Sequence, residues 1–230
     1  MQTNDKSILD LMKDIGAGKI QLPDFQRGWV WDDSHICGLI ASITQNFPVG
    51  AAMFLEYGND NVHFKYRMIE GAPKSDAKPD FLILDGQQRL TSIYSSLCSS
   101  RAVKTKTDKG NPITRFYYID IPKAVDPSVD RMDAIISVPE NKQMTSDFGR
   151  KIDLDVSTAE KEYENKLFPL NIMLDSVKAT QWQIGYMQYY QADPSVCQEY
   201  LTFMSEIIQT VSHYQIPVIT LDKETPKEAV

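Results

Sequence analysis

Residues 85–89, Asp-Gly-Gln-Gln-Arg, place a carboxylate, a glycine, two amides and a guanidinium group side by side. They follow the apolar residues 81–84, which predict a short buried strand, and they lead into a helix whose apolar residues recur at helical spacing over 90–98. The first turn of a helix exposes unpaired backbone N–H groups at the positive end of its dipole, where phosphate oxygens bind well. We therefore expect phosphate chemistry at this turn, with Arg89 as a charged fork.

The same residues also have a plain structural interpretation. Asp85 and Gln88 have the spacing of a capping box, which would account for this pair without any ligand. That interpretation does not account for Gln87 or Arg89. The helical period places Gln87 at the edge of the buried face, so its amide needs hydrogen-bond partners, either from a ligand or from loop backbone.

A second group of polar and aromatic residues lies upstream. Ile20 and Leu22 alternate with polar neighbours, which predicts a half-buried strand that Pro23 ends or holds at an edge. The following loop carries side chains that could contact phosphates or bases: Gln26, Arg27, Trp29 and Trp31. Gly28 beside Arg27 permits close approach of a ligand, whereas paired tryptophans are more often a packed anchor than a base-stacking platform.

These blocks resemble the N-terminal domain of the GmrSD-type modification-dependent restriction proteins and of the related phosphorothioate-sensing SspE proteins. The matching blocks are residues 20–27 with Trp31, residues 84–89, and residues 216–221 followed by 228–230. The resemblance implies a ParB-like or sulfiredoxin-like core, nucleotide binding and hydrolysis coupled to recognition of modified DNA, and a role in phage defence. It also implies an HNH-type nuclease domain in a missing C-terminal part or on a partner chain.

We accordingly predict an NTPase module that binds a nucleoside triphosphate with Mg²⁺. The residues expected to take part in hydrolysis are Asp85, Gln87, Gln88 and Arg89. Those expected to bind the nucleotide phosphates are Gln26, Arg27, Gly86, Gln87, Arg89 and Thr91. Asp85 would cap the helix or hold Mg²⁺ through water, and Gln87 or Gln88 would orient the attacking water.

Two alternatives remain open. The first is a non-catalytic module that recognises modified DNA through the side chains of Trp29, Trp31, Arg101, Lys104 and Lys106. The net charge of −7 excludes a DNA clamp over the whole surface, so this basic segment is either a local DNA-contacting arm or an ordinary solvated loop. The second alternative is a scaffold domain in which residues 85–89 only form a turn.

The composition is that of a globular domain, with 42% hydrophobic and 24% charged residues among 230. No run of about 18 apolar residues and no signal-peptide pattern is present, so we expect a cytoplasmic protein without membrane contact. The three cysteines and three histidines are scattered, which predicts no metal site and no disulfide framework. A P-loop lysine motif is absent.

The predicted fold class is α+β, a small mixed sheet with flanking helices and a mostly helical insertion, in a single domain over 1–230. Helices are expected near 5–16, after Asp32 or Asp33 until Pro48, and over 87–98. Strands are expected near 20–23, 51–57, 62–69, 81–84 and 115–121. We place the core at 1–121, the helical insertion at 122–212, and a return strand with the start of a truncated helix at 213–230.

Overall fold

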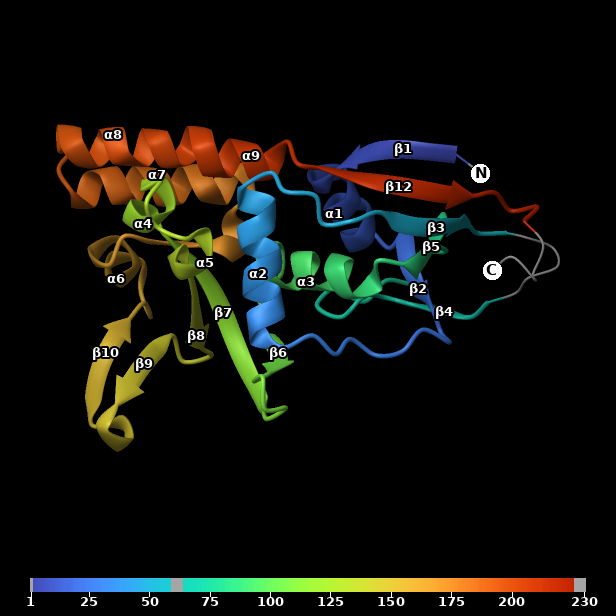
Figure 1. Ribbon diagram of the computed structural model, residues 1–230, viewed down its shortest axis with the longest axis horizontal. Helices are drawn as coiled ribbons and strands as arrows, with labels where there is room; N and C mark the ends of the chain where they lie inside the picture. Colours follow the sequence, from blue (N-terminus) through green and yellow to red (C-terminus); the bar gives the residue numbers. More distant parts are fainter. Residues whose placement is uncertain (1, 59–63, 226–230) are drawn as a thin grey trace.

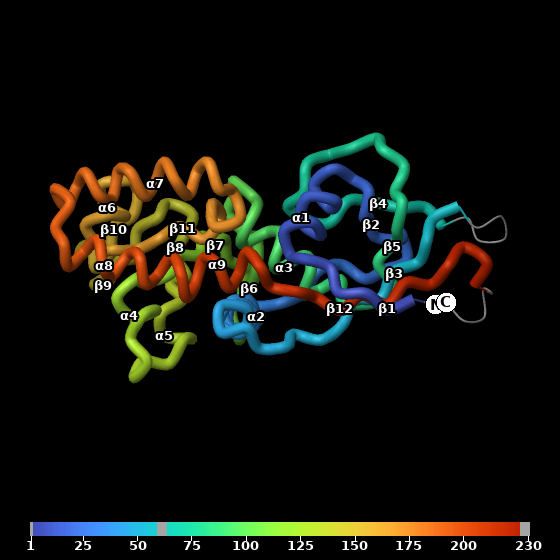
Figure 2. The backbone as a smooth tube through the Cα atoms, turned by 90° about the horizontal axis from the view of Figure 1, so that it is seen from above, coloured from blue at the N-terminus to red at the C-terminus, as the bar shows by residue number. Residues whose placement is uncertain are grey.

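The computed structural model describes residues 2–58 and 64–225 and has a mixed α+β fold, as predicted. Figure 1 shows two lobes side by side. The first lobe holds a six-stranded sheet with helix α1 (Ile8–Gly16), and the second lobe holds the strands and helices between residues 103 and 212. Helices α2 (Asp33–Thr44) and α3 (Gln87–Leu97) lie between the lobes, and Figure 2 shows the same division from above.

The sheet of the first lobe mixes parallel and antiparallel pairs in the order β1-β12-β3-β5-β2-β4. Its strands are β1 (Gln2–Ser7), β12 (Gln215–Leu221), β3 (Ala52–Glu56), β5 (Phe81–Asp85), β2 (Ile20–Pro23) and β4 (Tyr66–Arg67). The return strand β12 pairs antiparallel with β1 and parallel with β3, so the chain comes back to this sheet as predicted. Of the strand expected near 62–69, only 66–67 is a strand, and 62–63 lie outside the described residues.

The helix predicted near residues 5–16 begins later than expected, because residues 2–7 form the edge strand β1. That strand is polar and mostly exposed, so it lacks the apolar alternation that marks a half-buried strand. Helix α1 starts at Ile8, where the hydroxyl of Ser7 accepts a hydrogen bond from the backbone N–H of Asp10. Asp32 caps α2 in the same manner, and α2 ends at Thr44, before Pro48.

The second lobe contains more strand than the sequence predicts. Its sheet consists of β6 (Val103–Lys106), β7 (Pro112–Asp120), β8 (Ile135–Pro139) and β11 (Leu167–Pro169), with β7 in the centre. Strands β9 (Gln143–Ser146) and β10 (Lys151–Asp155) form a separate hairpin across the short turn η1 (Asp147–Gly149). The prediction of a mostly helical 122–212 is therefore wrong for its first half, and the strand expected at 115–121 belongs to this second sheet.

Helices complete the second lobe: α4 (Ile121–Val125), α5 (Arg131–Ala134), α6 (Ala159–Glu164), η2 (Leu170–Ile172), α7 (Ser176–Tyr189), α8 (Pro194–Phe203), η3 (Met204–Ile208) and α9 (Gln209–Ser212). The last three form one continuous helical run, in which the apolar residues at helical spacing face the core: Val196, Tyr200, Phe203, Ile207 and Val211 are buried, and Met204 and Ile208 are partly buried. One hydrophobic core extends through both lobes, from Ile8 and Leu22 to Tyr186 and Phe203. No helix within the described ranges has the length and apolar character needed to cross a membrane.

Candidate functional site

The turn between β5 and α3 carries the Asp-Gly-Gln-Gln-Arg motif and begins α3 without a side-chain cap. Gly86 occupies the N-cap position with φ +89°, a left-handed conformation that favours glycine, and a Cβ atom there would lie 3.2 Å from the Cβ of Ala52. The Asp85 carboxylate points into solvent with 73% of its side chain exposed. The capping-box interpretation of Asp85 and Gln88 is therefore wrong, and the first turn of α3 has no side-chain cap.

The two motif glutamines hold the upstream loop against α3. Gln87 donates from Nε2 to the backbone carbonyl of Arg27 at 2.6 Å. Gln88 accepts from the backbone N–H of Val30 at 2.9 Å and donates to the carbonyl of Gly28 at 3.3 Å. Loop backbone thus supplies the partner that the buried Gln87 amide requires, which is one of the two possibilities left open by the sequence.

Gln26 and Trp29 strengthen the same contact. The Gln26 amide donates to the carbonyl of Leu84 at 2.8 Å, and the Trp29 indole N–H donates to the hydroxyl of Ser92 at 3.0 Å. Arg67 also supports the loop, since it donates to the carbonyl of Gln26 at 3.3 Å and pairs with Glu70 at 3.1 Å. Arg67 and Ser92 were not predicted as supporting residues, because no local pattern reveals a partner more than 40 residues away.

Arg89 is engaged with backbone on the other side of the turn. Its guanidinium group donates to the carbonyls of Val49 at 2.6 Å and Ala51 at 2.8 Å, and lies 3.5 Å from the Asp85 carboxylate. Gly50 lies directly against it with φ +90°, so that a Cβ there would collide with Nη1 of Arg89. Arg89 therefore anchors the segment before β3, and the hollow beside it, about 10 Å³, has no room for a nucleotide.

Arg27 is the cation that remains free at this turn. Its side chain is exposed, and among the described residues it has no hydrogen-bond or ion-pair partner. The bonds from Gln26 to Leu84 and from Gln87 to Arg27 bring its backbone beside the motif. The backbone of Arg27 and the exposed Asp85 thus lie beside the start of α3. In general a guanidinium can bind phosphate and a carboxylate can hold Mg²⁺ through water.

Thr91 lies away from this surface. It is fully buried on the inner face of α3, and its hydroxyl has no hydrogen-bond partner among the described residues. A ligand outside the first turn does not reach this hydroxyl in the observed packing. The phosphate-binding role predicted for Thr91 would require movement of the helix or its neighbours.

The residues predicted to contact DNA come together in part. Trp29, Arg101 and Lys104 line one cleft of about 750 Å³ between the C-terminal half of α3 and β6. Trp31 is half-buried against the core, and its carbonyl accepts from Thr105 at 2.7 Å, which is an anchoring contact. The carboxylate of Glu70 reaches the same cleft, and its Oε2 is buried without a partner in the described structure.

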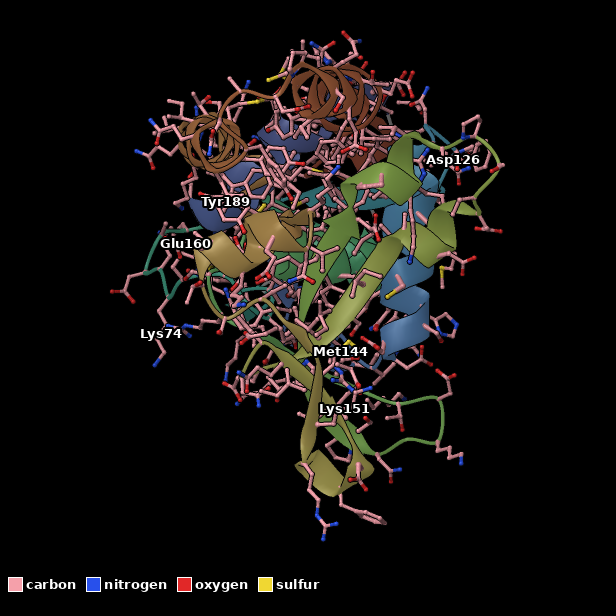
Figure 3. All side chains as sticks on the ribbon, turned by 90° about the vertical axis from the view of Figure 1, so that its left-hand side faces the viewer. Lys74, Asp126, Met144, Lys151, Glu160 and Tyr189 are labelled. Carbon is pink, nitrogen blue, oxygen red and sulfur yellow. The ribbon has the colours of Figure 1, made fainter. Side chains whose placement is uncertain are left out.

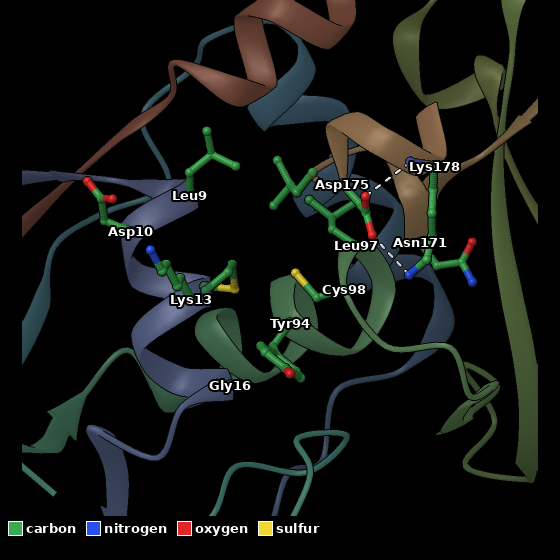
Figure 4. A pocket seen from close by; sticks show the side chains of 12 residues that line it. Leu9, Asp10, Lys13, Gly16, Tyr94, Leu97, Cys98, Asn171, Asp175 and Lys178 are labelled. Carbon is green, nitrogen blue, oxygen red and sulfur yellow. Dashed lines mark hydrogen bonds and ion pairs between the residues drawn. The ribbon is translucent and has the colours of Figure 1, made fainter. Parts of the chain in front are cut away.

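A second pocket of about 430 Å³ lies at the far end of α3, against α1 and the start of α7 (Figure 4). Its wall includes Lys13, Tyr94, Cys98 and the ion pair of Asp175 with Lys178 at 3.0 Å. Burial raises the pKa of the Cys98 thiol to about 12, so this thiol is protonated and weakly nucleophilic at neutral pH. Cys37 is buried as well, and burial raises its pKa to about 12.

Fold and site together define an α+β domain in which the side chains of Gln87 and Gln88 hold a loop that carries the exposed, unpartnered Arg27 against the start of α3. Residues 8–230 match the family model of the GmrSD restriction endonuclease, N-terminal domain, and the chain belongs to this family. The resemblance to the N-terminal domain of GmrSD-type restriction proteins is thus confirmed.

A protein of Methanocaldococcus jannaschii, "Uncharacterized protein MJ0686", is 30% identical over 222 residues. The alignment covers 94% of this chain and 35% of that relative, so the chain spans about a third of the relative's length.

Proposed function

We propose that this domain binds a nucleoside triphosphate with Mg²⁺ at the start of α3 and hydrolyses it as the regulatory module of a restriction protein. The observation that carries this proposal is the first turn of α3, which has no side-chain cap, with the unpartnered Arg27 in the loop bound to it. Membership in a restriction endonuclease family supports the wider role in phage defence. Cleavage would belong to an HNH-type nuclease domain outside this chain or on a partner, acting on modified DNA in the cytoplasm.

The residues at the turn divide into contacting and positioning groups. Arg27 and the backbone N–H groups of residues 87–89 would bind phosphate oxygens, and Asp85 would hold Mg²⁺ through water. Gln26, Gln88 and Arg89 would position the two segments, since their side chains are bound to backbone carbonyls. The Nε2 of Gln87 donates to the carbonyl of Arg27, whereas its Oε1 makes no hydrogen bond among the described residues. Oε1 is therefore the candidate for orienting the attacking water.

A thermal-shift screen against ATP, GTP, CTP and UTP with Mg²⁺ tests this proposal. A ligand at 100 times its dissociation constant stabilises a protein by about 2.7 kcal/mol, which raises the Tm of a domain of this size by roughly 5 to 10 °C. The shift should disappear in Arg27→Ala and persist in Arg150→Ala, which removes an exposed arginine from the distant β9–β10 hairpin. No shift with any nucleotide, or an undiminished shift in Arg27→Ala, would refute the site.

A second candidate function rests on the cleft of Trp29, Arg101 and Lys104, whose size suits a flipped or modified base. A DNA-reading module would bind modified duplexes with a steep salt dependence, and Lys104→Ala would weaken that binding. Equal affinity for modified and unmodified DNA would contradict this candidate. If neither nucleotide nor modified DNA binds, the scaffold interpretation of residues 85–89 stands.

A further inference from the structure

The pocket at the far end of α3, here called the interlobe pocket, lies where the two lobes meet (Figure 4). Helix α1 of the first lobe forms one wall, and η2 with the start of α7 in the second lobe forms the other. Helix α3 contacts both α1 and η2 and lines the space between them. The pocket volume of about 430 Å³ falls within the range of small-molecule sites, about 300 to 1,000 Å³. A ligand in this pocket would contact both lobes at the same time.

Apolar side chains form much of the interior of the interlobe pocket. Leu9 and Met12 come from α1, Leu97 from α3, and Leu174 from the segment before α7. Cys98 adds its thiol, which burial keeps protonated and which therefore behaves as a small apolar group with a weak donor. Removal of apolar surface from water favours binding, so these walls favour a ligand with an apolar body about the size of one or two rings.

Tyr94 brings a hydroxyl without a partner to the wall of this pocket. Only 8% of Tyr94 is exposed, and its hydroxyl makes no hydrogen bond among the described residues. The hydroxyl lies against α1, since a Cβ atom added at Gly16 would lie 3.1 Å from it. A buried tyrosine hydroxyl usually has a hydrogen-bond partner. An acceptor on a bound molecule would supply this partner.

The charged side chains of the interlobe pocket balance one another. Lys178 pairs with Asp175 at 3.0 Å. Asp10 lies in the first turn of α1 and Lys13 in its last turn, where the helix dipole favours an acid and a base respectively. These two acids and two bases are the charged residues that line the pocket within the described part of the chain. The pocket therefore has no excess charge to neutralise, which favours an uncharged ligand.

We infer that the interlobe pocket binds an uncharged, ring-bearing molecule that carries a hydrogen-bond acceptor such as a carbonyl group. The ring packs against the apolar walls, and the acceptor takes the hydrogen bond that the Tyr94 hydroxyl donates. Because the walls come from both lobes, the bound molecule bridges α1 and η2. The pocket lies at the opposite end of α3 from residues 85–89, so binding here is independent of the proposed nucleotide site.

Prodan, 6-propionyl-2-(dimethylamino)naphthalene, tests this inference because it is uncharged, has one naphthalene ring and carries one carbonyl acceptor. Its fluorescence shifts to shorter wavelength in an apolar site, which gives a binding curve. The wild-type chain should bind prodan saturably at one site. Tyr94→Phe should weaken this binding about fivefold, the usual effect of losing one hydrogen bond. N,N-dimethyl-2-naphthylamine, which is the same ring without the propionyl group, should bind the wild type and Tyr94→Phe equally.

Further variants locate the bound probe. Cys98→Phe places a ring in the pocket and should abolish prodan binding, with folding checked by circular dichroism. Tyr189→Phe is the matched control for Tyr94→Phe, because it removes an exposed hydroxyl near the opposite end of α7 (Figure 3). Tyr189→Phe and Arg27→Ala should both bind prodan as the wild type does.

Four results would overturn the inference. The first is the absence of saturable prodan binding by the wild-type chain, and the second is equal prodan affinity in Tyr94→Phe and the wild type. The third is undiminished binding by a folded Cys98→Phe protein. The fourth is loss of binding in Arg27→Ala, which would place the probe at the proposed nucleotide site instead. If Cys98→Phe does not fold, the comparison of Tyr94→Phe with Tyr189→Phe decides the question, because neither hydroxyl has a hydrogen-bond partner in the described structure.

Discussion

Arg27 and Arg89 both belong to the motif blocks, yet packing places them in opposite environments. Arg89 donates to two backbone carbonyls and is mostly buried, whereas Arg27 is exposed and has no partner within the described ranges. An arginine bound to buried acceptors contributes to stability, and its removal leaves those acceptors unsatisfied. An unpartnered surface arginine is instead available to a ligand.

We therefore expect Arg89→Ala to lower the free energy of unfolding by about 1.5 to 3 kcal/mol. Arg27→Ala should change it by less than about 0.5 kcal/mol, as for surface substitutions in general. Urea unfolding followed by circular dichroism measures both values. A stable Arg89→Ala protein would show that the hydrogen bonds to Val49 and Ala51 are dispensable for stability. Arg89→Lys tests whether a positive charge without the planar guanidinium group maintains the same stability.

Glu162 is a buried carboxylate in the second lobe, with a pH-dependent effect on stability. It accepts from the hydroxyl of Tyr118 at 3.0 Å and from the indole N–H of Trp182 at 2.9 Å, and Lys142 lies 3.5 Å away. Burial raises the pKa of Glu162 above its ordinary value of 4.5, although these partners oppose the rise. A raised carboxyl pKa means that the folded state favours the protonated form.

The contribution of Glu162 to stability should therefore be fully present below about pH 4.5 and decline as the pH rises through its folded-state pKa. Glu162→Gln removes this titration while its amide can still bond to Tyr118 and Trp182. The stability of the variant relative to wild type should accordingly increase between about pH 4.5 and pH 8 in urea unfolding. Parallel curves for the two proteins over this range would contradict the prediction.

Among the secondary-structure elements, the β5–α3 junction depends on one glycine. Gly86 has φ +89°, and an added Cβ would press on Ala52 of β3. We expect Gly86→Ala to destabilise the protein by about 1 to 3 kcal/mol and to weaken nucleotide binding, because the first turn of α3 would shift.

Gly28→Ala is the matched control, since nothing lies within 4 Å of a Cβ at that position and its φ is not left-handed. Differential scanning calorimetry of the two variants compares their Tm values. Equal Tm values for the two variants would show that the turn at Gly86 accommodates a side chain without loss of stability.

Across the whole molecule, the two lobes share one hydrophobic core. Helix α3 contacts α1 and α2 as well as η2 of the second lobe, and the continuous core includes residues of both lobes. We expect a single cooperative unfolding transition despite the two-lobed shape.

Far-UV circular dichroism and tryptophan fluorescence should give the same unfolding midpoint. The fluorescence of Trp182 reports on the second lobe, and that of Trp29 and Trp31 reports on the junction between the lobes. Two separate midpoints would show that the lobes unfold independently. Nucleotide would then be expected to raise only the midpoint of the first lobe.

Local signals in the chain were enough to place several elements and to identify the family. Apolar periodicity located α3, Pro23 marked the end of β2, and Asp32 marked the start of α2. The motif blocks indicated the family that the match over residues 8–230 confirms. Within each element and each motif block the residues that carry the signal are close together in the chain, so they can be recognised without reference to the fold.

Which side chains are free to act depends instead on tertiary packing. Gln87 and Gln88 bond to backbone about 60 residues away, and Arg89 to backbone about 40 residues away, so their roles depend on which segments pack together. The same holds for β1, an exposed polar strand that pairs with the edge of β12. It holds also for the second sheet, of which the sequence predicted only the central strand β7. Hydrogen-bond partners and sheet edges are supplied by distant parts of the chain, and a one-dimensional pattern cannot specify them.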